Sequence, residues 1–243
     1  MPGTHKRCRL NSRSDTIQVG MTHTFDCSYL QGKQEQLLVL QEESLDLTLF
    51  EKLLALGFRR SGETIYKPHC PHCQACLPIR IPVDLFMPSR RQKRTLKQNQ
   101  DVSWRLVDTC TDEHYALYDR YIKARHHDGP MYPPSREQYD HFVQCSWHPP
   151  KLLELRLEGE LIGVAVTDVL PNSLSAIYSF FAPALDKRSL GSLMILLQCD
   201  LARQMHKAHV YLGYQIHESR KMNYKTAYHP YEILTANGWQ LSE

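Results

Sequence analysis

The sequence has no long hydrophobic run, and its amino end has no apolar segment of the kind that directs secretion. A membrane-spanning helix needs about 20 apolar residues in succession, so we expect no membrane partner. The missing apolar segment also argues against a signal peptide, so we expect a cytoplasmic protein. In that reducing compartment, eight cysteines indicate metal or redox chemistry rather than disulfides.

The sequence also has no internal repeat and no low-complexity linker, which argues against a solenoid and against flexibly joined modules. Its formal charge of +3 is too small to indicate a nucleic-acid partner by itself. The 243 residues are enough for one large domain or two small ones. We place a boundary near residue 100, with a cysteine-containing domain over 1–100 and a second domain over 101–243.

Hydrophobic periodicity predicts a mixed α/β (α+β) protein with a largely antiparallel sheet. The sequence predicts a strand near 17–19 and a hairpin over 58–70. The other expected strands are 35–40, 79–83, 103–108, 152–157, 161–170, 175–181, 210–216 and a last strand over 232–241 with an Asn-Gly turn. The expected helices are 44–57, 89–100, 112–125, 135–145, 189–207 and 222–228. In the second half this order matches that of the acetyltransferase-like (GNAT) fold, which by itself does not give function.

Three cysteines stand at two successive spacings of two intervening residues, at Cys70, Cys73 and Cys76. Thiolates so spaced can converge on one zinc ion or one iron–sulfur cluster. The expected fourth ligand is Cys27, with His69, His72 or Cys8 as second choices. The alternative is a tight loop of reduced thiols that binds no metal.

A basic run follows the cysteines on the helix expected at 89–100. Its five cationic residues form one positive stripe that would suit a tRNA phosphate backbone, namely Arg90, Arg91, Lys93, Arg94 and Lys97. A merely solvated helix face is the alternative. Nearby Arg59, Arg60, Lys67 and Arg80 favour the nucleic-acid interpretation.

Candidates for acid–base chemistry stand further along the chain. His126 lies in a histidine pair, and histidine titrates near neutrality. Asp168 interrupts an apolar strand, so it must be paired or functional. The alternatives are a capped helix end for His126 and a strand-end turn for Asp168.

Two stretches near the carboxyl end are candidates for binding a nucleotide. Arg188 opens a long helix, where free backbone N–H groups can hold a phosphate. The single Gly191 in that loop is a poor match for the glycine-rich loop that binds CoA. In the following stretch, four tyrosines interleave with two lysines and could clamp a nucleotide end, although a packed corner would look similar; they are Tyr211, Tyr214, Tyr224 and Tyr228 with Lys221 and Lys225. Of these, the predicted substrate-binding residues are Tyr214, Lys221, Tyr224 and Lys225.

Together these motifs resemble the arginyl/leucyl-tRNA–protein transferase family, most closely its bacterial aspartate/glutamate leucyltransferase branch. The matching strings are CSYL, FRRSG-x3-YKPHC-x2-C-x2-C-x-PIR, SR-x-QKR, RYI-x-ARH-x-DG-x-MYPP, VAVTDVLP, the SLG helix start and YLGYQI-x-E-x3-MNYK. They span about residues 20–230. The cysteine pattern departs from the eukaryotic branch, where a C-x2-C motif is followed later by an adjacent cysteine pair.

The resemblance implies an enzyme that moves leucine from leucyl-tRNA to the N-terminal Asp or Glu of proteins and so marks them for degradation. The donor ester is already activated, so neither ATP nor CoA is expected. His126 or Asp168 would accept a proton from the acceptor amine. The acceptor's acidic side chain needs a cation, and the candidates are Arg80, Arg125 and Lys225.

Three other functions stay open at this point. Arginyl-tRNA would be the donor in another branch of the same family. An acyl-CoA N-acyltransferase would share the second half of the fold, and a zinc-ribbon RNA-binding adaptor would share the first half but catalyse nothing.

Overall fold

The computed structural model describes residues 18–41, 45–129 and 131–242. Several predictions lie outside this part: the loose segment before residue 18, Cys8, the first residue of the strand expected at 17–19 and the first residue of the helix expected at 44–57. Within the described part, no helix is long and apolar enough to cross a membrane.

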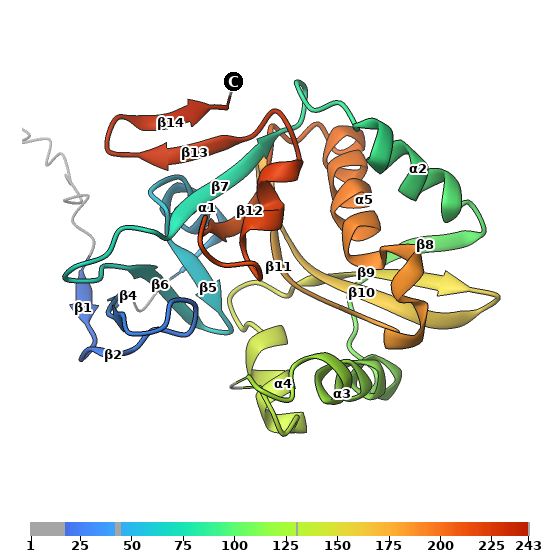
Figure 1. The fold of residues 1–243 in the computed structure, drawn as a ribbon, viewed down its shortest axis with the longest axis horizontal. Coiled ribbons are helices and arrows are strands. Elements are labelled where there is room, and N and C mark those ends of the chain that lie inside the picture. Colours follow the sequence, from blue (N-terminus) through green and yellow to red (C-terminus); the bar gives the residue numbers. More distant parts are fainter. Residues whose placement is uncertain (1–17, 42–44, 130, 243) are drawn as a thin grey trace, which may run out of the picture.

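An eight-stranded sheet forms the centre of the molecule (Figure 1). Its order is β14 (Gly238–Leu241), β13 (Glu232–Thr235), β7 (Leu77–Pro82), β12 (His209–Gln215), β11 (Ser173–Phe181), β10 (Glu160–Val169), β9 (Lys151–Leu157) and β8 (Val102–Val107). Only β11 and β12 run parallel, and every other neighbouring pair is antiparallel. The predicted mixed, largely antiparallel sheet is confirmed.

Helices cover both faces of this sheet (Figure 1). On one face α5 (Leu190–Gln204) and α2 (Arg90–Gln98) pack over residues such as Leu153 and Leu155. On the other face α3 (Asp112–Arg125) and α4 (Arg136–Val143) pack over residues such as Leu152. Successive strand residues point to opposite faces, which is why the apolar run of β9 serves both layers.

A smaller sheet lies beside the large one, in the order β1 (Val19–Met21), β4 (Leu37–Leu40), β6 (Thr64–Pro68) and β5 (Arg59–Ser61). Its core includes α1 (Leu47–Ala55) together with Tyr211 from the large sheet and Leu170, which follows β10 directly. A two-stranded ladder of β2 (Phe25–Asp26) and β3 (Gln34–Glu35) completes this half. The two sheets therefore share one apolar cluster.

The large sheet continues across the predicted boundary near residue 100. Strand β7 precedes that boundary, yet it pairs with β12 on one side and β13 on the other. Helix α2 also precedes it and packs on α5. The division into domains 1–100 and 101–243 stays a prediction, but the strand pairing does not follow it.

Local sequence signals account for several element ends. Ser89 and Gln92 form a reciprocal capping box at the start of α2. Glu158 and Gly159 both have positive φ, 52° and 88°, as the tight turn between β9 and β10 requires. The last strand expected over 232–241 is instead a hairpin of β13 and β14, because the Asn-Gly turn reverses the chain at Gly238, whose φ is 91°.

Candidate functional site

A cavity of about 600 Å³ lies where β11 and β12 stop pairing. Their ladder runs only from Ser173–His209 to Ser175–Tyr211, and beyond it Ala176–Ser179 and Leu212–Tyr214 line the cavity. Gly213 has a φ of 86°, at a register shift between β12 and β7. The parallel pair thus opens into a space that side chains from other elements enclose, which we call the central cavity.

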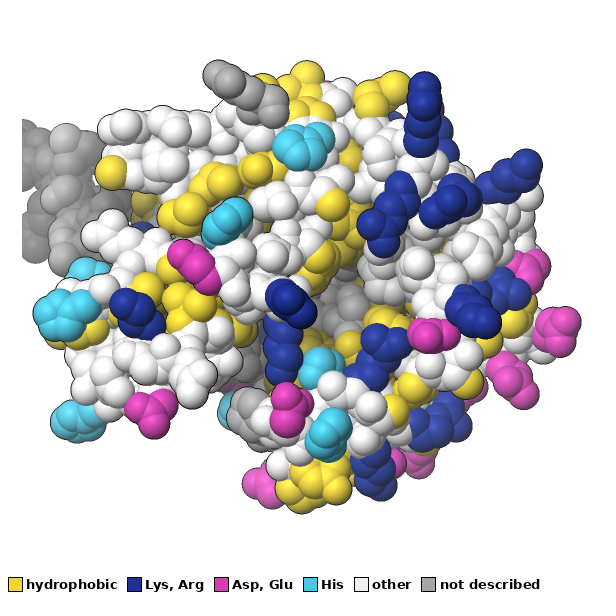
Figure 2. All heavy atoms as spheres, in the orientation of Figure 1, with side chains coloured by type: hydrophobic (Ala, Val, Ile, Leu, Met, Phe, Trp, Pro, Cys, Tyr) yellow, Lys and Arg dark blue, Asp and Glu magenta, His cyan; other side chains and the backbone are white. Residues whose placement is uncertain are grey.

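Residues from both halves of the chain enclose the central cavity. Strands β5 and β6, the end of α3, the start of α5 and the segment after β12 all contribute side chains. Figure 2 shows a hollow near the middle of the molecule, with hydrophobic and basic side chains around it. The cationic side chains among the lining residues are Arg59, Arg60, Arg125, Lys221 and Lys225. No aspartate or glutamate is among the described lining residues, so the cavity suits an anionic ligand.

Lys225 is one of the two most buried of the predicted substrate-binding residues, with 6% of its surface exposed, as for Tyr214. It lies in the short helix η2 (Asn223–Ala227), and its Nζ donates to the Tyr214 carbonyl oxygen at 2.6 Å. Burial, and then the charge of Arg59, lower the pKa of Lys225 to about 7. A neutral amine is therefore populated at physiological pH.

His126 caps the end of α3 and lines the same cavity. Its ring centre lies 5.1 Å from that of Tyr121. Burial is the main cause that lowers the His126 pKa below its usual range, and the positive charge of Lys221 adds to it. The imidazole is accordingly neutral at neutral pH and can accept a proton.

Asp168, the other predicted proton acceptor, is fully buried and is not among the lining residues of the central cavity. Its carboxylate accepts two hydrogen bonds from Arg60, from Nε at 2.7 Å and from Nη2 at 2.5 Å. His148 Nε2 lies 3.6 Å from the same carboxylate. Of the two possibilities that the sequence left for Asp168, the structure shows the paired one, and a catalytic role stays untested.

The remaining predicted substrate-binding residues divide into two groups. Arg125, Tyr214, Lys221 and Tyr224 line the cavity. Arg80 does not: it pairs with Glu232, with 2.5 Å between Nε and Oε2, and its guanidinium lies 4.1 Å from the Trp239 ring centre. The structure thus brings together all of these residues except Arg80.

The five predicted tRNA-binding residues of the basic run are all exposed on α2, namely Arg90, Arg91, Lys93, Arg94 and Lys97. Figure 2 shows Lys and Arg side chains gathered over this part of the molecule. Arg188, also predicted to bind tRNA, is held by Asp101 through two hydrogen bonds of 2.8 Å each. The exposed stripe is free to meet a polyanion, whereas Arg188 would first have to leave its partner.

The predicted metal ligands Cys27, Cys70, Cys73 and Cys76 lie near one another. Burial, followed by the neighbouring Cys70 and Cys27, raises the pKa of Cys76 to about 12. All seven cysteines in the described part are free thiols. As the side chains stand, however, no group of three or more His, Cys, Asp or Glu residues in that part is placed to hold a metal ion. The donor chemistry suits a metal, but the geometry shown here does not fit one.

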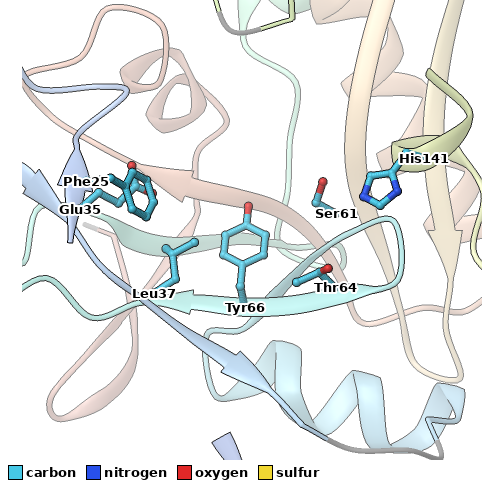
Figure 3. A pocket seen from close by; sticks show the side chains of 7 residues that line it. All are labelled: Phe25, Glu35, Leu37, Ser61, Thr64, Tyr66 and His141. Carbon is cyan, nitrogen blue, oxygen red and sulfur yellow. The ribbon is translucent and has the colours of Figure 1, made fainter. Parts of the chain in front are cut away.

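A second, open groove of about 380 Å³ lies on the smaller sheet, between β3, β4, β6 and helix α4. Figure 3 shows Tyr66 in the middle of its lining, with Phe25 and Glu35 on one side and Thr64 and His141 on the other. Tyr66 also lines the central cavity. The groove is therefore a neighbour of the cavity, separated from it by this ring.

Sequence reasoning gave Arg59 and Arg60 only a general role near nucleic acid and did not assign them to this site. Two consecutive arginines in a strand point to opposite sides, and here Arg60 meets Asp168 while Arg59 reaches the rings of Tyr211 and Tyr214. The signal was the pair of adjacent arginines at the start of the hairpin, directly after Phe58. Asp168, the partner of Arg60, lies 108 residues later in the chain, so motif spacing alone could not reveal this pairing.

Comparison with known proteins identifies the family to which this chain is similar. Two family profiles match, "Arginine-tRNA-protein transferase, N terminus" over residues 25–94 and "Arginine-tRNA-protein transferase, C terminus" over residues 113–235. A protein of Shewanella amazonensis named aspartate/glutamate leucyltransferase is 62% identical, over 93% of this chain and 96% of its own length. One of the same name from Aeromonas hydrophila is 53% identical, over 92% and 94%.

A solved structure shows the likeness of fold alone. It is the C-terminal domain assigned to a lysylphosphatidylglycerol synthetase of Agrobacterium fabrum, with a TM-score of 0.50 and 12% identity over 77% of this chain and 64% of that one. This likeness supports the GNAT-like architecture predicted from the order of the elements. On the two profile matches and the high identities, the chain belongs to the arginine-tRNA-protein transferase family.

Proposed function

We propose that this protein transfers leucine from leucyl-tRNA to the α-amine of proteins that begin with Asp or Glu, and so marks them for degradation. The single observation that carries this proposal within the structure is the central cavity, whose lining has four cationic residues besides Arg60, which Asp168 neutralises, and no carboxylate among the lining residues described. An acidic acceptor residue would supply the missing negative charge. The names of the relatives give the same transferred group, leucine, and the same acceptors, aspartate and glutamate.

The reaction needs positioning more than activation. Leucine is already an ester of the terminal ribose, so no ATP is consumed. The acceptor amine attacks the ester carbonyl and forms a tetrahedral intermediate, which expels the ribose hydroxyl. An amide bond replaces the ester bond, and the proton that leaves the amine balances the one gained by the ribose oxygen. Holding the ester and the amine together in one cavity would supply most of the acceleration.

An acceptor amine is protonated at neutral pH and must lose a proton before it attacks. Two lining residues are neutral enough to accept it, His126 and Lys225. Asp168 is a weaker candidate, because both of its oxygens already accept hydrogen bonds from Arg60. We therefore assign proton transfer to His126 or Lys225.

The exposed stripe of α2 is the proposed site for the acceptor arm of the tRNA. Helix α2 packs on α5, and the start of α5 contributes Gly191, Ser192 and Ile195 to the cavity wall. A phosphate backbone lying along α2 could thus send its aminoacylated end into the cavity. Charge neutralisation by this stripe would make the binding dependent on salt.

The thiol cluster of Cys27, Cys70, Cys73 and Cys76 is proposed to hold zinc or an iron–sulfur cluster once its side chains close around the ion. Elemental analysis and a visible spectrum of anaerobically purified protein test this proposal. We expect either bound zinc or the visible absorption of an iron–sulfur centre, lost when Cys76 is changed to Ser. Metal-free protein with full activity would refute it.

The decisive test uses radiolabelled leucyl-tRNA and arginyl-tRNA with reporter proteins that begin with Asp, Glu, Arg or Ala. We expect leucine to appear only on the Asp and Glu reporters. Transfer of arginine would keep the family and change the donor. Acylation from an acyl-CoA without tRNA, or RNA binding without turnover, would favour the other two functions.

A further inference from the structure

We propose that Arg59 is the residue that makes the protein specific for acidic acceptors, because its guanidinium receives the side-chain carboxylate of the acceptor's N-terminal Asp or Glu. This inference rests on the proposed function and adds to it the group that recognises the acceptor. Sequence patterns pointed instead to Arg80, Arg125 and Lys225 for this role.

Arg59 lies deep in the central cavity with hydrogen-bonding capacity left over. Its residue exposure is 5%, and it projects from β5. Nη2 donates to the Gly213 carbonyl oxygen at 3.0 Å, with the Ile79 carbonyl oxygen 3.5 Å away. Within the described part of the chain, Nε and Nη1 are buried and have no hydrogen-bond partner. Two nitrogens of the Arg59 guanidinium therefore carry N–H groups that have no hydrogen-bond acceptor in that part.

A buried guanidinium with unpaired N–H groups is unfavourable in free energy unless a ligand pairs with it. Burying a charge without a counter-ion or full hydrogen bonding is strongly unfavourable, and here burial lowers the Arg59 pKa from its usual value. The rings of Tyr211 and Tyr214, whose centres lie 5.2 and 6.0 Å from Cζ, compensate only in part. A carboxylate that accepts a hydrogen bond from Nη1 or Nε would supply a missing partner and neutralise the charge.

Asp168 does not serve as that carboxylate. Both of its oxygens accept from Arg60, which lies next to Arg59 in β5 but on the opposite face of the strand. Of the two arginines, Asp168 thus pairs with Arg60 alone, and Arg59 has no hydrogen-bonded counter-ion among the described residues.

Each other cation in the cavity is less suited to the role. Arg125 is exposed and lies over the Phe181 ring, 5.3 Å from its centre. Lys221 is exposed and lies 3.5 Å from Asp128. Lys225 has a pKa of about 7, so it is charged in only part of the molecules at neutral pH. Among the described lining residues, Arg59 alone combines a permanent charge, deep burial and unpaired N–H groups.

The chemistry of this site separates acids from their amides. Asn and Gln have nearly the shape of Asp and Glu, but they carry no charge, and the amide nitrogen donates where the guanidinium also donates. Binding them would leave the Arg59 charge buried without a counter-ion. Losing a charge-assisted pair of this kind corresponds to about a ten- to hundredfold preference.

The test compares reporters that begin with Asp, Glu, Asn or Gln in the full-length protein and in two variants. Arg59→Met removes the charge with a side chain that tolerates burial, and Arg59→Lys keeps the charge without the fork. We expect Arg59→Met to lower kcat/KM for the Asp and Glu reporters by about tenfold to a hundredfold. Any effect of the lost charge on Lys225 should apply equally to all four reporters, so the ratio of kcat/KM between acids and amides falls towards one, with Arg59→Lys in between.

Three controls keep the result interpretable. Thermal unfolding of Arg59→Met shows whether the variant folds, and filter binding shows whether its affinity for leucyl-tRNA is unchanged. Arg125→Met removes a charge from the same cavity and should keep the preference for acids. Retention of the preference in Arg59→Met, its loss in Arg125→Met instead, or an equal loss of leucyl-tRNA binding in Arg59→Met would each overturn the proposal.

Peptide binding without tRNA separates this inference from the proposed function. Calorimetry compares the wild-type protein and Arg59→Met with peptides that begin with Asp or with Asn. We expect a preference for Asp in the wild type and none in the variant. If the wild type moved no leucine yet showed this preference, the proposed function would fail while Arg59 kept its role. Equal binding of the two peptides by the wild type would overturn the Arg59 assignment.

Discussion

Lys225 differs from an ordinary lysine because its ammonium is buried beside another cation. Burial and the charge of Arg59 bring its pKa to about 7. Deprotonation thus occurs within the physiological range, and the neutral amine becomes a base as pH rises. If a carboxylate binds Arg59, it offsets part of the repulsion and raises the basicity of Lys225 when the acceptor is in place.

If Lys225 accepts the proton, leucine transfer should rise with pH through about 7 and level off above it, because only the neutral amine is active. Lys225→Met should remove this limb and lower kcat by about a hundredfold, the usual scale for a lost general base. The measurement is the pH dependence of kcat/KM from pH 5.5 to 9, because this ratio reports the pKa of the free enzyme. His126→Asn is the matched variant, since the His126 pKa is lowered and its limb would fall below about 6.5. If His126→Asn removed the rise in transfer near pH 7 and Lys225→Met left that rise unchanged, the assignment to Lys225 would be wrong.

Glu154 is a buried carboxylate whose role is stability. Burial alone would raise its pKa, but hydrogen bonds from Arg156, Arg105 and His114 lower it to about 2. The folded pKa is below the unfolded one, so the stabilisation is complete above about pH 4.5 and is lost as pH falls towards about 2.

We therefore expect Glu154→Gln to lower the free energy of unfolding by about 2 kcal/mol at pH 7. The difference from the wild type should shrink as pH falls from about 5 to about 2. Denaturant unfolding at several pH values measures both effects. Glu113→Gln is the control, because Glu113 pairs with Arg156 at an exposed position, where ion pairs contribute little. A difference that stays constant over this pH range would refute the expectation.

At the scale of the element, α2 combines a buried and a basic side. Gln92 and Thr95 are buried against the protein, while five cations are exposed. Reversing three of those charges in Arg90→Glu/Arg94→Glu/Lys97→Glu should weaken leucyl-tRNA binding at least about tenfold near 0.1 M salt. The affinity should also depend less steeply on salt concentration, by an amount that corresponds to the loss of about two to three phosphate contacts.

Filter binding over a salt series measures this effect, and circular dichroism checks that the variant folds. Three charge reversals on other elements, at Lys33, Lys52 and Arg120, provide a variant with the same net charge. An unchanged salt slope in the α2 variant, or an equal loss in the control, would refute a specific role for this helix.

The elements that sequence reasoning predicted well are those with local signals. The Ser89 cap and the apolar strands of 152–181 are read from neighbouring residues, and the structure has these elements within one or two residues of the expected ends. Pairings between distant residues were not accessible in the same way. Arg80 carries the expected positive charge, but its guanidinium donates to Glu232, which lies 152 residues later in the chain. Arg59 and Arg60 look alike in the sequence, and only the fold gives one of them a counter-ion.

At the scale of the whole molecule, β7 joins the two halves. Its residues Ile79 and Ile81 have no exposed surface, and the strand separates β12 from the β13–β14 hairpin. A fragment of residues 101–243 would lack this strand and expose the edges of both neighbours.

We expect the fragment 101–243 alone to be insoluble or to unfold without cooperativity, and co-expression with 1–100 to rescue it. Gel filtration and thermal unfolding followed by circular dichroism are the measurements. A fragment of residues 74–243 keeps β7 and α2 and should be the more soluble of the two. Cooperative unfolding of 101–243 on its own would show that β7 is dispensable.

The depth of Arg59 also limits which proteins can be modified. With only 5% of this residue exposed, the recognised side chain must leave the surface of its own protein and enter the cavity. Each extended residue spans at most about 3.6 Å, so the first few residues of the acceptor must be unfolded and free of their neighbours. A protein whose amino end is packed into its own core would escape modification even if it begins with Asp. The enzyme would therefore select acceptors by the accessibility of their amino ends as well as by the identity of their first residue.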